Sequence, residues 1–379
     1  MLKSLLREYQ EMQEERNKNA RNTLRVKVVG CGGGGNNSLR RFHSLGMDGV
    51  ETIAINTDSQ HLYTIDADRK ILIGEWLTNG HGAGGNPELG ERCAVESRTE
   101  IKEAIGRADI VFITAGLGGG TGTGSAPVVA EIAKKARALV VAVVTMPFDY
   151  EGQRRKKSAL RGLHRLQKLA DSIIVLDNNK LLDLVPDLPL DAAFGFLDQL
   201  VATIISGLID AIQKPSLINI DFADIKAVLG SGGVSTILCG EGPANDPAAV
   251  VTDTLKNNLL DVDYSGATGA VIHITCDEKL PVEKISTMVK AITSGLSDDA
   301  NVIFGVRQDP EMGGMVRILT VLTGVRTPYL TGEYAGQERN GGLRKKPVWH
   351  STRDEIRGRS LPAEIYSGSH ARGAVEAWK

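Results

Sequence analysis

AGLGGGTGTGSAP, residues 115–127, follows an apolar run and precedes a helical pattern, and five glycines and two threonines crowd its centre. Glycines let a backbone approach a phosphate closely, and threonine hydroxyls add hydrogen-bond donors. A helix N-terminus favours an anion because its first N–H groups lack partners within the helix. Pro127 is expected in the first turn of that helix. The stretch therefore predicts a phosphate-binding loop, and it is not a Walker A loop because no lysine follows the glycines.

Two further glycine loops precede this one, VKVVGCGGGGNNS at 26–38 and NGHGAGGNPELG at 79–90. The first contains the spacing G-x-G-x-x-G, and Glu51 stands about where the ribose-binding acid of a dinucleotide site would lie. Taken alone, this loop fits a structural turn, an NAD site or a nucleoside triphosphate site. Three such loops at strand-to-helix junctions favour a clamp for a polyphosphate, whereas an NAD site normally needs one.

Around these loops, strand-like and helical patterns alternate. The helical segments include NPELGERCAVESRTEIKEAIGRA and APVVAEIAKKARA. Several of the strand-like runs are apolar without alternation, as in strands that are buried on both faces. This order predicts an α/β fold with a doubly wound parallel sheet. The strand-like runs lie at 24–30, 51–57, 70–74, 109–116, 138–146 and 171–177.

The pattern changes after this region. Residues 191–213 read as one long apolar-rich helix, and shorter strands with intervening helical pieces follow it. We expect a smaller α+β domain there, and a polar, flexible tail beyond it. The predicted segments are an N-terminal helical extension (1–23), a nucleotide-binding domain (24–190), a central helix (191–214), a C-terminal α+β domain (215–325) and a flexible tail (326–379).

The composition is that of an ordinary soluble protein, with 42% apolar, 24% charged and 4% aromatic residues among 379. The net charge of -2 argues against a nucleic-acid partner. The sequence has no run of eighteen apolar residues, so we expect no direct membrane insertion. Residues 1–22 lack the apolar core of a signal peptide. The four cysteines show no metal-binding spacing, so we expect free thiols in a reducing cytoplasm.

Several polar and aromatic residues follow predicted strands at positions suited to a nucleotide. Glu151 and Arg155 are four apart and would share a helix face, either as a surface ion pair or as contacts to ribose and nucleotide. Asn178 follows a strand end, where its amide could read a base edge. Phe194 and Asp198 could stack on and bind guanine, but a core phenylalanine and a surface aspartate are the more ordinary interpretations.

The segment LINIDFADIKAVLG, residues 217–230, carries Asn219, Asp221 and Asp224 just beyond the long helix. Either aspartate could cap a helix. Carboxylates can also orient a water for attack on a γ-phosphate. The glycine loops are expected near the other end of the long helix, about 35 Å away. The carboxylates could not reach a nucleotide in their own subunit, but they could reach one bound to the next subunit in a head-to-tail filament.

At this point the sequence resembles a known family. GLGGGTGTGSAPVVAEIA is similar to the tubulin signature G-G-G-T-G-[ST]-G. The stretches GCGGGGNN, INTD, GAGGNP, PFDYEGQRR and NIDFADIK, in this order and spacing, resemble the FtsZ family of tubulin-like cell-division GTPases. The resemblance runs over about residues 24–325. The N-terminal extension and VVGCGGGGNNS suggest the archaeal type.

The resemblance implies a role for each matched position. The residues matched to nucleotide binding are Gly33, Gly34, Gly35, Asn36, Asn37, Gly84, Gly85, Gly118, Gly119, Gly120, Thr121, Gly122, Glu151, Arg155, Asn178, Phe194 and Asp198. The residues matched to the loop that completes the neighbouring subunit's GTPase site are Asn219, Asp221 and Asp224.

The resemblance also implies an activity. The chain would bind GTP or GDP with Mg²⁺, for which we assign no protein ligand. It would polymerise head to tail, hydrolyse GTP only once assembled, and form a cytoplasmic division ring at midcell. Membrane-anchoring or division proteins would bind its tail. The alternatives are a non-divisional filament protein for cell shape or partition, a dinucleotide-dependent oxidoreductase, and a purely structural homologue.

Two features depart from the family pattern. Asp177 stands where proline is common, directly before Asn178. The tail shows no clear match to the bacterial C-terminal anchor peptide.

Overall fold

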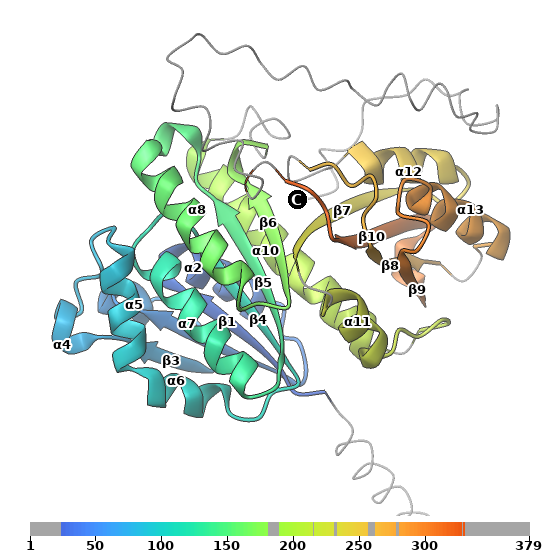
Figure 1. Cartoon of the computed structure of the whole chain (residues 1–379). Coiled ribbons are helices and arrows are strands. Elements are labelled where there is room, and N and C mark those ends of the chain that lie inside the picture. The colour runs from blue at the N-terminus through green and yellow to red at the C-terminus, as the bar shows by residue number, and fades with distance from the viewer. Residues whose placement is uncertain are drawn as a thin grey trace, which may run out of the picture. The chain divides into compact units, whose positions relative to one another are not determined.

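The computed structural model describes residues 24–180, 189–214, 216–230, 233–256, 262–277, 280–327 and 329. The predicted N-terminal extension and nearly all of the predicted tail lie outside these residues. Ten strands form one sheet in the described part of the chain, in the order β3-β2-β1-β4-β5-β6-β7-β10-β8-β9 (Figure 1).

The first six strands in this order are parallel to one another. Strands β4 and β5 are buried along nearly their whole length, which is why their sequences are apolar without alternation. This half of the sheet confirms the predicted doubly wound α/β fold. The strands are β1 (Val26–Cys31), β2 (Val50–Asn56), β3 (Arg69–Leu72), β4 (Ile110–Gly116), β5 (Leu139–Met146) and β6 (Ser172–Asp177).

The helices of this half lie on both sides of the sheet. Figure 1 shows α5, α7 and α8 in front of it, with the long helix α10 (Leu190–Gln213) behind. Helix α7 contacts α5, α6 and α8, and α2 contacts both α10 and α7. The other helices are α2 (Gly32–His43), α3 (Ser59–Tyr63), α4 (Glu75–Thr78), α5 (Pro87–Glu96), α6 (Arg98–Ile105), α7 (Thr121–Lys135), α8 (Gln153–Gln167) and the 3₁₀ turn Asp149–Glu151.

The start of α7 differs from the sequence-based expectation. The helix begins at Thr121, so Pro127 lies inside it rather than in its first turn. The glycine-rich run is helical because the backbone of α5 packs so closely against it that no side chain would fit. A methyl group added at Gly124 would lie 2.2 Å from the carbonyl oxygen of Pro87. Close packing of α7 on α5 therefore overrides the poor helix propensity of glycine.

Helix α10 confirms the predicted long helix and lies in the core. Val201, Ile205 and Ile209 are almost fully buried and belong to one apolar cluster with strands of the sheet. By length and hydropathy alone, residues 191–213 would pass as a membrane span. In the structure this apolar character serves core packing, as in the central helix of a folded domain.

The remaining strands form the other half of the sheet, in which β10 is antiparallel to β7 and β8, and β8 is parallel to β9. Two residue pairs, Ile173 with Val234 and Ile174 with Ser235, join β6 to β7, so the sheet continues without a break. The predicted domain boundaries stay a prediction. These elements are α11 (Phe222–Leu229), β7 (Val234–Pro243), α12 (Pro247–Lys256), β8 (Gly269–Cys276), α13 (Val282–Thr293), β9 (Asn301–Gln308), the 3₁₀ turn Pro310–Met312 and β10 (Met315–Thr323).

Replacing Gly124 with alanine is expected to lower the free energy of unfolding by about 1–3 kcal/mol, because the new methyl group overpacks the contact between α5 and α7. It would meet the carbonyl oxygen of Pro87 at 2.2 Å and the backbone nitrogen of Glu91 at 2.5 Å. Thermal unfolding monitored by circular dichroism measures the change. The matched control is Gly195→Ala in α10, whose added methyl group comes no closer than 3.9 Å to the side chain of Arg41. Equal melting temperatures for the two variants would contradict the packing argument.

Candidate functional site

The three glycine loops meet at the carboxyl edge of the parallel strands. A methyl group added at Gly32 would lie 2.6 Å from the backbone nitrogen of Gly122. One added at Gly120 would lie 2.8 Å from the backbone nitrogen of Asn86. The backbones of the loops are therefore in contact, at the point between β1 and β4 where doubly wound folds bind ligands.

Two helices begin inside these loops. Helix α2 starts at Gly32 and α7 at Thr121, and neither has a side-chain hydrogen bond at its N-cap. Their first N–H groups are thus left for a ligand, and both helix dipoles favour an anion. Gly33 and Gly34 are exposed at the start of α2. In the third loop, Gly84 and Gly85 are exposed with φ of 55° and 72°, a conformation that favours glycine.

Side chains hold the loops in place. The hydroxyls of Thr57 and Thr121 lie 2.6 Å apart and are buried, and the backbone N–H of Gly118 donates to Oγ1 of Thr123 at 2.9 Å. Oδ1 of Asn37 lies 3.1 Å from Nε2 of His61. Thr57 and His61 were not among the predicted site residues, although Thr57 belongs to the INTD motif and His61 follows it closely.

Asn36 and Gly35 lie beneath the first loop. Asn36 is fully buried, and its Nδ2 donates to the carbonyl oxygen of Ile55 at 3.2 Å. Its Oδ1 has no partner among the described residues. Gly35 packs on the backbone of Thr114, where a methyl group would lie 2.2 Å from the carbonyl oxygen. Buried polar atoms are almost always paired, so the free Oδ1 is a candidate for contact with a ligand or water.

Aromatic residues line one side of the same edge. The rings of Phe148 and Phe194 meet edge to face with centroids 5.4 Å apart, and Phe148 stacks on Tyr150 at 4.9 Å. Phe194 is 40% exposed, so its ring is available to a planar ligand. Asn178 is buried at the end of β6, and its Oδ1 has no partner in the described part of the chain. An aromatic face and an unpaired amide oxygen suit a base.

Asp198 lies on α10 against the first loop. Its Oδ1 accepts a hydrogen bond from the hydroxyl of Ser38 at 2.7 Å. Burial raises the pKa of Asp198 to about 6, opposed by the Ser38 hydrogen bond and by Arg40 and Arg41. A desolvated carboxylate with spare acceptor positions suits a ligand that carries N–H donors. Ser38 was absent from the sequence-based prediction because it is 160 residues away in the chain.

Glu151 and Arg155 form the ion pair that their spacing predicts. The other carboxylate oxygen of Glu151 accepts from the backbone N–H of Phe148 at 2.8 Å. A methyl group added at Gly118 would lie 3.0 Å from the carbonyl oxygen of Arg155, and one at Gly119 would lie 3.9 Å from its guanidinium. The start of α8 therefore adjoins the central glycine loop.

The carboxylates of the last motif lie apart from this cluster, beyond the C-terminal end of α10. Asp221 occupies the N-cap position of α11 without a side-chain cap hydrogen bond, and Asp224 lies in its first turn. Both are exposed, and neither side chain has a hydrogen bond or ion pair to a described residue. The backbone before them is fixed, because Leu217 and Ile218 hydrogen-bond to Val306 of β9. The side chain of Asn219 accepts from the backbone of Ser216 at 2.9 Å.

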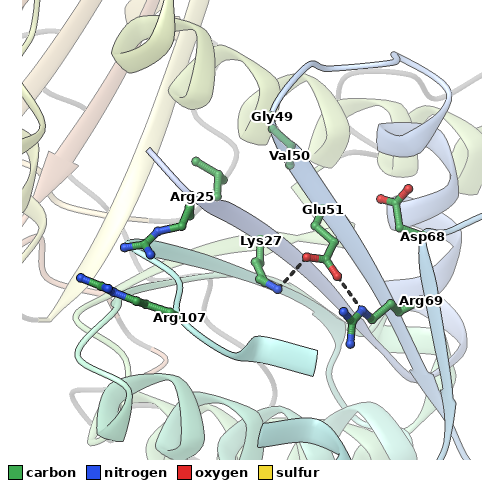
Figure 2. Close-up of a pocket in the computed structure, with 9 residues that line it drawn as sticks. Arg25, Lys27, Gly49, Val50, Glu51, Asp68, Arg69 and Arg107 are labelled. Atoms are coloured by element: carbon green, nitrogen blue, oxygen red, sulfur yellow. Dashed lines mark hydrogen bonds and ion pairs between the residues drawn. The ribbon is translucent and has the colours of Figure 1, made fainter. Parts of the chain in front are cut away.

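Glu51 does not belong to the site. Figure 2 shows its carboxylate between Lys27 and Arg69, with oxygen-to-nitrogen distances of 2.6 and 2.7 Å. These residues line a hollow of about 490 Å³ at the amino ends of β1 and β2, whereas the glycine loops follow the carboxyl ends. Glu51 cannot contact a ribose bound at the loops, so the geometry argues against a dinucleotide site.

The described residues contain no group of three or more His, Cys, Asp or Glu side chains placed to hold a metal ion. None of the four cysteines forms a disulfide, and Cys31, Cys93 and Cys276 are buried. Burial raises the pKa of Cys31 to about 12, so its thiol stays protonated beside the loops.

Comparison with known proteins identifies the family. The GTPase domain of the tubulin/FtsZ family matches residues 25–186, and the C-terminal domain of the FtsZ family matches residues 233–326. The chain is 51% identical over 313 residues to cell division protein FtsZ 2 of Methanocaldococcus jannaschii, covering 82% of each chain. It is 48% identical over 309 residues to FtsZ 2 of Halobacterium salinarum, covering 81% of this chain and 78% of the relative. The solved structure of the empty FtsZ dimer of M. jannaschii superposes with a TM-score of 0.77 at 48% identity, covering 83% of this chain and 92% of that one. The chain therefore belongs to the tubulin/FtsZ family of GTPases and is related to archaeal FtsZ proteins.

Proposed function

We propose that this GTPase polymerises head to tail, and that each active site forms from two subunits. The observation that carries this proposal is the separation of two incomplete half-sites. The glycine loops and base-binding residues lie near the start of α10, and Asp221 and Asp224 lie beyond its end. A helix of 24 residues is about 36 Å long. Carboxylates beyond its end therefore cannot reach phosphates bound near its start in the same subunit.

Both ends expose apolar side chains that an interface would cover. Tyr150 is exposed beside the aromatic cluster at the loop end. At the other end, Leu217 and Ile218 are exposed just before the carboxylates and pair with Val306 of β9. The same strand also exposes Val302 and Phe304. Stacking one end on the other is a heterologous contact, which builds an open filament. The related M. jannaschii FtsZ has been solved as a dimer.

In the proposed mechanism the N–H groups of the glycine loops bind the β- and γ-phosphates and stabilise the charge that develops there. Asn178, Phe194 and Asp198 bind guanine, and Glu151 and Arg155 contact the ribose and nucleotide. Asp221 and Asp224 of the next subunit orient a water toward the γ-phosphate, with Asn219 beside them. Mg²⁺ would accompany GTP and would neutralise phosphate charge, and no side chain of this chain is assigned to hold it.

The cellular role we propose is a cytoplasmic division ring at midcell, because the relatives at about half identity are named cell division proteins. Loss of longitudinal contacts after hydrolysis would make the filament dynamic. Membrane-anchoring or division proteins would bind the tail. Localising a tagged copy distinguishes this role from cell shape or partition, since a division protein gathers at midcell before constriction.

Turnover of GTP per molecule is expected to rise steeply as the protein concentration passes the assembly threshold. The reason is that an isolated subunit lacks the carboxylates that complete its site. Phosphate release measured beside GTP-dependent sedimentation over a concentration series tests this expectation. A rate per molecule that stays constant through the threshold would contradict completion of the site by a neighbour. Guanosine diphosphate in place of GTP is the control, because it has no γ-phosphate and should support neither phosphate release nor stable assembly.

A further inference from the structure

Tyr329 links the segment after β10 to the end of β6. Its hydroxyl donates a hydrogen bond to Oδ2 of Asp177, 152 residues earlier in the chain. Both side chains are buried, with 4% and 7% exposure. Asp177 directly precedes Asn178, the residue proposed to read the base.

The other oxygen of Asp177 continues the chain of hydrogen bonds. It accepts from both the backbone N–H and the side-chain amide of Asn179, each at 2.9 Å. Oδ1 of Asn179 in turn accepts from the backbone N–H of Asp149 at 2.9 Å. Asp149 opens the 3₁₀ turn that contains Tyr150 and Glu151. The network therefore runs from Tyr329 to the turn that carries the proposed ribose contact.

This network lies behind two walls of the nucleotide pocket without contributing a proposed nucleotide contact of its own. The backbone of Asn178 sits between the two residues, Asp177 and Asn179, that the network fixes. A buried carboxylate that loses one hydrogen-bond donor is left incompletely satisfied, and its surroundings rearrange to recover a partner. Removing the hydroxyl of Tyr329 would thus change the placement of Asn178 and of the Glu151 turn together.

We propose that Tyr329, acting through Asp177, is a positioning residue that sets the affinity and base selectivity of the guanine-nucleotide pocket. The proposal rests on the proposed function, because it takes the ligand of the pocket to be GTP. The chain continues beyond Tyr329 to Lys379. A partner that engages the following residues and displaces the tyrosine would therefore alter nucleotide binding at the opposite end of this network.

The test is Tyr329→Phe in the full chain, which removes one oxygen and keeps the ring. The affinity for GTP is expected to fall by about tenfold. A change of this size corresponds to the lower end of the free energy that one hydrogen bond to a charged group contributes. The preference for GTP over ATP should fall as well, because Asn178 is no longer held in place. Equilibrium titration with both nucleotides measures both quantities. The matched control is Tyr264→Phe, since the hydroxyl of Tyr264 has no hydrogen bond to a described residue.

Asp177→Asn is the second variant, because asparagine can keep the acceptor toward Asn179 and still pair with the tyrosine hydroxyl. It should bind GTP more tightly than Asp177→Ala, and Tyr329→Phe should add little to Asp177→Ala in a double-mutant cycle. A lower melting temperature with unchanged GTP affinity and unchanged GTP-to-ATP ratio would show a merely structural role and overturn the proposal. Failure of the wild-type chain to bind GTP in the same titration would instead overturn the proposed function, and this inference with it.

Discussion

Replacing Asp224 with alanine is expected to lower GTP turnover about 100-fold or more, the usual effect of losing a group that orients or activates the attacking water. GTP binding and GTP-dependent assembly should persist, because the nucleotide pocket lies beyond the far end of α10. The substitution should not unfold the protein. Asp224 is exposed in the first turn of α11, and its side chain has no hydrogen bond or ion pair to any described residue. Surface changes of this kind usually alter the free energy of unfolding by less than about 0.5 kcal/mol.

Phosphate release and sedimentation of the same samples measure the two effects on Asp224→Ala separately. The matched control is Asp299→Ala, which removes an exposed carboxylate just before β9. Turnover near the wild-type value in assembled Asp224→Ala would remove this residue from the mechanism. Loss of both turnover and assembly would show that Asp224 acts in the subunit contact rather than on the water.

The sequence predicted the nucleotide-binding half of the fold because its signals are local. Strands β4 and β5 are buried on both faces and therefore read as continuous apolar runs, and the loops at 26–38 and 115–127 lie at strand-to-helix junctions as expected. The expectation was wrong for the loop at 79–90, which follows the short helix α4 instead of a strand. The start of α7 was placed too late, because Gly124 is helical through its packing on α5 rather than through its own propensity. Propensity and position relative to Pro127 carry no information about that contact.

Side-chain partners across the site were beyond the reach of sequence patterns. Ser38 meets Asp198 over 160 residues, and Tyr329 meets Asp177 over 152. Each pair depends on how β6, α2, α10 and the segment after β10 pack. A single hydroxyl that bonds to a distant carboxylate produces no periodic pattern in the sequence. The junction of β6 with β7 also escaped prediction, because only two residue pairs form it. The sequence thus predicted which loops meet, but not the hydrogen bonds that fix them.

Replacing Asp198 with asparagine is expected to weaken GTP binding about 100-fold or more, since each hydrogen bond to a charged group contributes about 1.5–3 kcal/mol. In the proposed complex the carboxylate accepts from two donors of guanine, N1–H and the exocyclic amine. Asparagine keeps one acceptor and turns an N–H group toward these donors. The hydrogen bond from Ser38 can be kept by the remaining oxygen, so the fold should survive. Titration with GTP measures the loss, and Asp191→Asn, an exposed position at the start of the same helix, is the control.

The pH dependence of GTP binding tests the same contact. Because burial raises the pKa of Asp198 to about 6, the free protein takes up a proton there as the pH falls through 6, and GTP affinity should then drop by up to about tenfold per pH unit. The effect of falling pH on folding stability through Asp198 has the opposite sign. The raised pKa means that the folded chain holds this proton more tightly than the unfolded chain, so falling pH between about 6 and 4 relieves the cost of burying the charge. Unfolding driven by Asp198 therefore cannot account for lost binding in this range. Wild-type affinity that stays constant from pH 7.5 to about 5.5 would contradict the proposed guanine contact.

The two variants together test whether one site uses two subunits. Asp224→Ala keeps an intact nucleotide pocket, and Asp198→Asn keeps intact carboxylates beyond α10. If the carboxylates act on the nucleotide of the neighbour, a mixture restores the contacts wherever an Asp198→Asn subunit presents its α11 to the pocket of an Asp224→Ala subunit. Turnover of the mixture should then exceed the sum of the two separate rates. A simple sum would place both halves of the active site in one subunit, which the length of α10 opposes.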